Sequence, residues 1–235
     1  MKALLAWSSG KDSAWSLHVL RRQGDVEVAG LLTTVNEAFG RVAMHAVRRE
    51  LLEAQARAAG LPLTAVAIPY PCPNEVYEAA MARALAEARA GGIGAVAFGD
   101  LFLEDVRRYR EERMAPTGLR PLFPLWGAPT RALAEQMIDG GLRARLTCVD
   151  PKALPDSFAG RAFDHDLVAA LPPGVDPCGE RGEFHTFAWD GPMFDHPVPV
   201  AVGEVVHRDG FVFADLLPDT DMTQSPQGLA EKHQR

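Results

Sequence analysis

The sequence predicts an α/β fold, a doubly wound parallel sheet followed by a smaller α/β domain. Short apolar runs alternate with stretches of helical periodicity in the first half, and the first apolar run leads directly into a loop of small residues. The texture changes near Pro121, where prolines cluster around Trp126. We therefore expect a first domain at residues 1–125, a second at 126–217, and a polar, disordered tail at 218–235.

In the first domain the expected elements alternate between strand and helix. Apolar runs predict strands at residues 3–7, 26–34, 63–68 and 95–98. Apolar residues three and four apart predict the helices between them, which end at Gly24, at Gly60 and at Gly91. Because such sheets bind ligands at the carboxyl ends of their strands, a site is expected in the loops that follow the strands.

The second domain has fewer but clear signals. A short helix should end at Gly140, an apolar run follows at residues 145–149, and another helix is expected near residues 164–171. Two strand-like runs, 198–207 and 211–217, are separated by Asp209 and Gly210, a typical hairpin turn. The second domain is therefore expected to carry an antiparallel hairpin.

Composition excludes several classes of protein. Among 235 residues, 47% are hydrophobic and 23% charged, and no apolar stretch approaches the roughly 20 residues of a membrane span, so we expect a cytoplasmic protein without membrane contact. The net charge of −7 disfavours extended nucleic-acid binding. The basic run at Arg107, Arg108 and Arg110 is interpreted as a solvated helix face rather than a phosphate contact.

The loop Ser8–Ser13 has the character of a pyrophosphate-binding loop. It joins a strand to a helix, whose free N–H groups and positive end favour a polyanion. The members expected to bind nucleotide are Ser8, Ser9, Gly10, Lys11, Asp12 and Ser13. Lys11 can follow negative charge onto a leaving pyrophosphate, and Asp12 can hold magnesium. A Walker A loop is excluded, since Leu5 and Asp12 break its pattern; the alternative is an ordinary capped helix.

A second polar segment, residues 178–186, concentrates charge around two glycines. In an extended chain Glu183 and His185 would share a face and could orient a nucleophile, a metal or a cationic substrate, while Phe184 anchors the other face. The alternative is a solvated loop. A third candidate pair is Asp100 and Glu104, which could hold magnesium or an amine if a helix starts there, or could merely favour a helix N-terminus.

These segments together resemble the diphthine–ammonia ligase family of PP-loop ATP pyrophosphatases. The resemblance rests on Ser8–Ser13, Met44–His45, Gly99–Asp100, Pro124–Trp126 and Cys178–Thr186, and it spans about residues 1–217. Arg181 stands where that family usually has asparagine. Ser9 stands where many such loops have glycine.

The resemblance implies an adenine nucleotide alpha hydrolase-like first domain that binds ATP and Mg²⁺. Adenine would lie near Leu32, Thr33 and Thr34, with His45, Gly99 and Asp100 also at the nucleotide. The predicted catalytic residues are Lys11, Asp12, Glu183 and His185. Substrate-binding residues are expected in the second segment and at one helix start: Glu104, Gly179, Glu180, Gly182, Glu183, Phe184, His185 and Thr186.

The implied reaction converts a carboxylate to an acyl-adenylate, releases pyrophosphate, and lets ammonia displace AMP to form an amide. The carboxylate acceptor is open and need not be diphthine, and a homodimer is left open as well. Two other functions compete with this reaction. A PP-loop tRNA-modifying enzyme would want paired reactive cysteines or a basic surface, and a nucleotide-binding sensor without turnover would not need the second polar segment.

Overall fold

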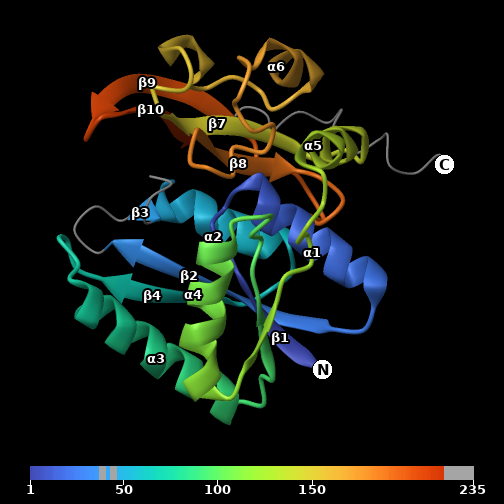
Figure 1. The fold of residues 1–235 in the computed structure, drawn as a ribbon, viewed down its shortest axis with the longest axis vertical. Helices are drawn as coiled ribbons and strands as arrows, with labels where there is room; N and C mark the ends of the chain where they lie inside the picture. Colours follow the sequence, from blue (N-terminus) through green and yellow to red (C-terminus); the bar gives the residue numbers. More distant parts are fainter. Residues whose placement is uncertain (37–40, 43–46, 220–235) are drawn as a thin grey trace.

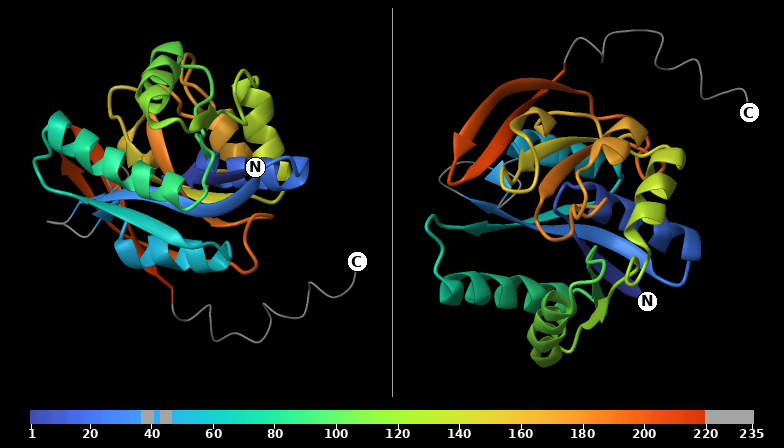
Figure 2. Two further views of the ribbon diagram at one scale, coloured as in Figure 1. Left: turned by 90° about the horizontal axis from the view of Figure 1, so that it is seen from below. Right: turned by 45° about the horizontal axis from the view of Figure 1, so that its top comes forward.

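A computed structural model describes residues 1–36, 41–42 and 47–219, and it stacks two sheets and their helices in layers (Figure 1). α3 (Asn74–Ala90) and α4 (Glu104–Met114) cover the outer face of the first sheet. α1 (Lys11–Gln23) and α2 (Arg49–Ala58) lie between this sheet and the second one. In the right-hand view of Figure 2 the second half of the chain lies across one side of the N-terminal half.

The first sheet is parallel and doubly wound, which confirms the predicted fold class. Its parallel strands are ordered β4-β2-β1-β5-β6, so the chain runs outward from β1 on one side and then resumes on the other side of β1. The strand order therefore reverses between β1 and β5, the place where such sheets bind ligands. The bounds are β1 (Lys2–Ala6), β2 (Glu27–Asn36), β4 (Leu63–Ile68), β5 (Ala95–Ala97) and β6 (Arg120–Leu122).

Two strands of this sheet were not expected from the sequence. β6 contains Pro121, which had been interpreted as a sign of the domain boundary. A proline is tolerated in a strand at the edge of a sheet, and β6 is such an edge. The short β3 (Arg41–Val42) pairs antiparallel with the end of β2.

The second sheet is antiparallel, with strands in the order β8-β7-β10-β9. The predicted hairpin is present as β9 (Val200–Arg208) and β10 (Phe211–Pro218), and it turns through Asp209 and Gly210, both with positive φ. The other two strands are β7 (Arg143–Val149) and β8 (Phe184–Asp190). α5 (Thr130–Asp139) and α6 (His165–Ala170) accompany this sheet, as the sequence predicts.

Alternating side chains of the first sheet pack into two hydrophobic cores, one on each face of the sheet. Leu5, Leu31 and Ala97 point to the α1–α2 side, whereas Leu4 and Leu32 point to the α3–α4 side. The larger core also contains second-sheet residues, so the α1–α2 layer is packed from both sides.

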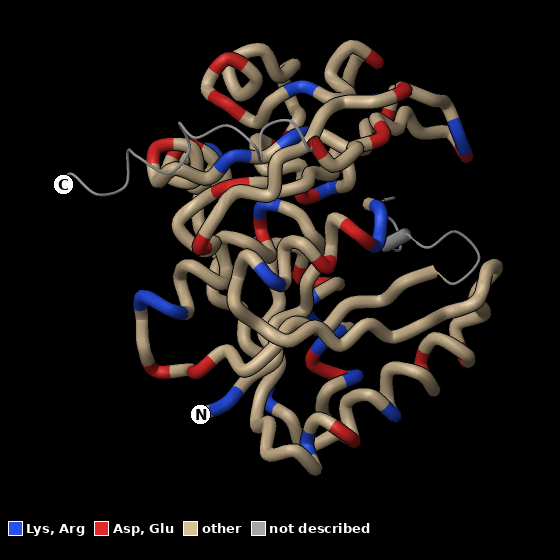
Figure 3. The backbone as a smooth tube through the Cα atoms, turned by 180° about the vertical axis from the view of Figure 1, so that it is seen from behind, with Lys and Arg blue, Asp and Glu red and all other residues tan. Residues whose placement is uncertain are grey.

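The predicted boundary at residues 125 and 126 stays a prediction. Most of the predicted tail, residues 220–235, lies outside the described residues, and Pro218 ends β10. In the described part of the chain no helix is long and apolar enough to cross a membrane. Acidic and basic residues are interspersed along the tube in Figure 3.

Candidate functional site

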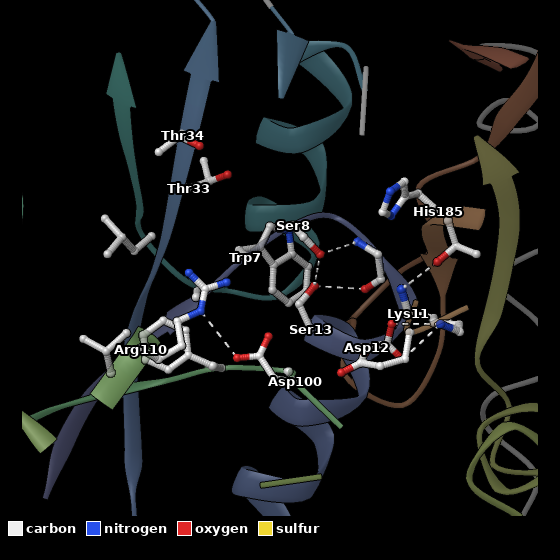
Figure 4. Close-up of a pocket in the computed structure, with 18 of the residues that line it drawn as sticks. Trp7, Ser8, Lys11, Asp12, Ser13, Thr33, Thr34, Asp100, Arg110 and His185 are labelled. Carbon is white, nitrogen blue, oxygen red and sulfur yellow. Dashed lines mark hydrogen bonds and ion pairs between the residues drawn. The ribbon is translucent and has the colours of Figure 1, made fainter. Parts of the chain in front are cut away.

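A cavity of about 530 Å³ opens at the carboxyl ends of β1, β2 and β5. Its wall brings together segments that lie far apart in the chain: most of the loop Ser8–Ser13, the end of β2 at Leu32–Thr34, the pair Gly99–Asp100, and parts of the segment Cys178–Thr186. Figure 4 shows side chains from these segments around the cavity. Parts of all three polar candidates of the sequence thus meet in one place, at the reversal of the strand order.

The loop after β1 is held in a tight turn by its own serines. Ser9 adopts φ 70°, a left-handed conformation that serine rarely takes. The Ser8 hydroxyl accepts a hydrogen bond from the Gly10 amide at 3.3 Å and lies 3.3 Å from the Ser13 hydroxyl, which donates to the Gly10 carbonyl at 2.9 Å. Ser8 and Ser13 line the cavity, whereas Ser9 is buried behind it.

The first N–H of α1 is capped by the second sheet. Gly10 is the N-cap and has no side chain to offer, and the Thr186 hydroxyl of β8 accepts from the Lys11 amide at 3.0 Å instead. A side chain at Gly10 would lie 3.3 Å from the Thr186 carbonyl oxygen, so β8 and the helix start approach closely. Thr186 therefore joins the second half of the chain to the N-terminal end of α1.

Lys11 is buried rather than free in the cavity. Its ammonium donates to both Asp12 carboxylate oxygens, at 3.0 and 2.8 Å, and to the Cys178 carbonyl. The rings of Phe163 and Phe184 each have their centroid 5.5 Å from it. Burial by itself lowers the pKa of Lys11, but the Asp12 carboxylate, with smaller contributions from Cys178 and Glu180, outweighs burial and holds that pKa above its ordinary value.

Gly99 and Asp100 approach the loop from β5. A side chain at Gly99 would meet the Asp12 backbone at 3.1 Å, which explains the glycine. Asp100 pairs with Arg110 of α4, Nε to Oδ2 3.4 Å. Arg110 itself lines the cavity and lies over the Phe98 ring, its guanidinium carbon 4.9 Å from the centroid. The prediction that the arginine run is only a solvated face is therefore wrong for Arg110.

Glu180 reaches across from the second half to the loop after β5. Its Oε1 accepts from the Leu101 amide at 2.7 Å, and its own amide donates to Asp176 Oδ2 at 2.9 Å. Burial raises the pKa of the Glu180 carboxyl to about 7, with Asp12 and Asp100 adding in the same direction. A carboxyl that titrates near neutrality in the cavity wall can exchange protons with a bound ligand.

Glu183 does not reach the cavity. Its carboxylate accepts from the Asp176 amide at 2.9 Å and from the Arg181 amide at 3.0 Å, so it closes its own loop. β8 begins one residue later, and the expected shared face of Glu183 and His185 is not formed. The catalytic role predicted for Glu183 thereby loses its geometric basis. Gly182, at φ 88°, turns the same loop and also lies off the cavity wall.

His185 and Phe184 do line the cavity, at the start of β8. Burial, with the Lys11 charge adding to it, lowers the pKa of His185 to about 4, so the imidazole is neutral at physiological pH. Gly179, also on the wall, has φ 69°, and a side chain there would lie 2.8 Å from the Phe184 carbonyl oxygen. These positions agree with a ligand-facing role for the start of β8.

One further predicted residue is not at the site. Glu104 is exposed as the first residue of α4 and does not line the cavity, because the helix begins four residues after Asp100 and the two carboxylates share no helix face. His45 lies outside the described residues. Among the residues that are described, no three His, Cys, Asp or Glu side chains group to hold a metal ion.

Sequence reasoning missed Gln55, a fully buried residue of α2 that contacts the loop after β1. Its signal was available: Gln55 occupies an apolar position of the helix, four residues after the buried Leu51. A buried amide at such a position has to be hydrogen-bonded, so its partners could have been sought among nearby backbone groups.

Comparison with known proteins matches both halves of the chain to one family. Residues 1–121 match the diphthamide synthase N-terminal domain, and residues 129–214 match the diphthamide synthase C-terminal domain. The diphthine–ammonia ligase of Danio rerio is 36% identical over 116 residues, which cover 46% of this chain and 45% of that protein. The one of Homo sapiens is 32% identical over 120 residues, which cover 48% and 45%.

The matched region therefore spans about half the length of these curated relatives. Among solved structures, a predicted subunit of tRNA methyltransferase from Methanocaldococcus jannaschii aligns with a TM-score of 0.37 and 18% identity, over 57% of this chain and 73% of that one. This likeness is too low to bear on fold or function.

Proposed function

Since the chain belongs to the diphthamide synthase family, we propose that it is an ATP-dependent ligase that forms an amide from a carboxylate and ammonia. The relatives' name, diphthine–ammonia ligase, says that those proteins join diphthine to ammonia. One observation carries the proposal to this chain: the loop Ser8–Ser13 and the start of β8 form one cavity wall at the carboxyl ends of the parallel strands. A nucleotide and an acceptor can meet there.

ATP would lie with its phosphates at the N-terminus of α1 and its adenine toward the end of β2 at Leu32–Thr34. The helix dipole and the hydroxyls of Ser8 and Ser13 favour a polyanion at this place. The acceptor carboxylate attacks the α-phosphorus and pyrophosphate leaves. Ammonia then attacks the acyl carbon, AMP leaves, and one proton is released with formation of the amide.

Mg²⁺ fits the site as a companion of the phosphates. It commonly binds through one or two carboxylates together with phosphate oxygens and water, and Asp12, with a quarter of its side chain exposed, can supply one such carboxylate. Bound there, the ion would neutralise charge on the departing pyrophosphate. Coordination by Asp12 would compete with its ion pair to Lys11, which would free the ammonium to follow the phosphate charge.

The acceptor is recognised by the second half of the chain. The residues of this half that line the cavity include Gly179, Glu180, Phe184, His185 and Thr186. They offer a bound acceptor three different groups: the Glu180 carboxyl with a pKa of about 7, the neutral imidazole of His185 and the buried ring of Phe184. Diphthine is the acceptor that the relatives' name suggests. Arg181, which departs from the family's usual asparagine, does not line the cavity, and its guanidinium lies over the Phe102 ring and near the Glu183 carboxylate.

The thiols argue against the tRNA-modifying alternative. Burial raises the pKa of Cys148 and of Cys178 to about 12, so neither supplies the thiolate that sulfur transfer needs. The other alternative, a nucleotide-binding sensor, differs from the ligase in that it binds nucleotide without turnover, so a measurement of turnover separates the two.

The test is a screen of carboxylate acceptors with ATP, Mg²⁺ and ammonium, in which AMP and pyrophosphate are both quantified. Equal amounts of the two, dependent on the acceptor, are expected. ADP and phosphate would refute adenylation. Lys11→Met should abolish pyrophosphate release, and Lys152→Met, a change of an exposed lysine, is the matched control. Nucleotide binding without turnover for any acceptor would favour the sensor.

A further inference from the structure

We propose that Gln55 is a positioning residue, which holds the loop Ser8–Ser13 in its phosphate-binding conformation by fastening it to β8. The inference rests on the proposed function in one respect, that this loop binds the phosphates of ATP. Gln55 belongs to α2, which contributes no residue to the cavity wall. It would therefore act on the nucleotide only through other residues.

The side-chain amide of Gln55 acts both as a hydrogen-bond acceptor and as a hydrogen-bond donor. Its Oε1 accepts a hydrogen bond from Trp7 Nε1 at 2.9 Å. Its Nε2 donates to the Ser9 carbonyl at 3.0 Å and to the Ala188 carbonyl at 2.6 Å. Gln55 is fully buried, so water does not replace these partners. One amide thus joins the end of β1, the loop and β8.

These contacts are made where the loop is strained. Ser9 has φ 70°, and its carbonyl accepts a second hydrogen bond, from the Ala188 amide at 2.9 Å. A non-glycine residue in this conformation persists only when its surroundings determine it. Here the Gln55 amide and the Ala188 amide both donate to the Ser9 carbonyl, and Gln55 also holds Trp7 on the other side of Ser8. These contacts fix the conformation of Ser9. The orientation of Ser8 and Gly10 toward the cavity follows from it.

The geometry makes specific demands on residue 55. Glutamate would turn acceptor oxygens toward the carbonyls of Ser9 and Ala188, and methionine would fill the space but leave these carbonyls and Trp7 Nε1 with one partner fewer. Either change acts on the loop through hydrogen bonds. A packing change elsewhere in α2 would not, so a positioning role can be separated from a merely structural one.

The experiment compares Gln55→Met with Leu52→Ala in the full chain. Leu52 is a fully buried core residue of the same helix, and its truncation destabilises the fold through packing. ATP affinity is measured by calorimetry at a temperature at which both variants are folded. Gln55→Met should weaken ATP binding by about tenfold or more, as expected when buried loop groups lose partners, while Leu52→Ala stays near wild type.

Equal ATP affinities for the two variants would overturn the proposal. If Gln55→Met does not fold, Gln55→Asn, which keeps the amide but shortens its reach, replaces it with the same expectation. If the wild type binds no ATP, the proposed function fails. The positioning role is then judged by hydrogen exchange at the Gly10 and Ala188 amides, which should speed up in the Gln55 variant and not in Leu52→Ala.

Discussion

Replacing Thr186 with valine tests whether the second sheet caps the N-terminus of α1. Thr186 is 2% exposed, and its hydroxyl accepts from the Lys11 amide at 3.0 Å. Valine has nearly the same shape, so Thr186→Val removes this acceptor without opening a cavity. The Lys11 amide is then left buried at the first turn of α1 without its partner.

The expected loss of stability follows from two opposing terms. A buried N–H without a partner costs about 1–3 kcal/mol, and a buried methyl in place of the hydroxyl returns about 0.8 kcal/mol. The net loss is about 0.2–2 kcal/mol, which lowers the Tm of a chain of this size by up to about 8 °C. Thermal unfolding followed by circular dichroism measures it.

Thr147 provides the matched control. It is also a buried threonine of the second sheet, 3% exposed, but among the described residues its hydroxyl has no hydrogen-bond partner. Thr147→Val should leave the Tm unchanged or raise it, since it removes an unsatisfied polar group. If Thr186→Val were as stable as Thr147→Val, the cap would contribute nothing and the reasoning would be refuted.

Three more predictions concern titration and thiol chemistry. Because burial raises the pKa of Glu180 to about 7 from 4.5, the folded state binds its proton more tightly, and the wild type should lose stability relative to Glu180→Gln as pH rises between these values; parallel Tm–pH curves would contradict this. The His185 imidazole, with its pKa lowered to about 4 from 6.5, should stay neutral across most of that interval in NMR titrations, and a midpoint near 6.5 would argue against its burial. In the native protein iodoacetamide should label Cys72 and spare Cys148 and Cys178, whose pKa values burial raises to about 12; peptide mass spectrometry reads the result, and modification of either buried thiol would speak against the packing.

Much of the fold was predictable because local patterns and tertiary structure agree. The apolar runs that became β1, β2, β4 and β5 are short, continuous and separated by helical periodicity, as buried parallel strands require. β6 was not predicted, since its central Pro121 reads as a break unless the strand is known to lie at an edge. Whether a strand lies at the edge of a sheet depends on the tertiary structure and cannot be inferred from a short stretch of sequence.

The cavity wall was predictable where backbone chemistry defines it, in the loop Ser8–Ser13 and at Gly99. It was not predictable where the direction of a side chain decides whether the residue reaches the cavity. Glu183 and Glu180 are both carboxylates of one loop, yet the first closes that loop on itself and the second faces the cavity. Gln55 was missed for a related reason, because its partners come from β8 and from the loop after β1.

The hydrogen bond from the Ala188 amide to the Ser9 carbonyl joins residues 179 positions apart in the chain. During synthesis on a ribosome the first apolar runs and the serine loop emerge early, whereas β8 emerges only after the residues that precede Phe184 have been made. Contacts between such distant residues form late, since the intervening chain has to be ordered first. The nascent N-terminal half is therefore expected to fold into its sheet before β8 fixes this loop, so the proposed ATP binding would begin only after the second sheet has docked.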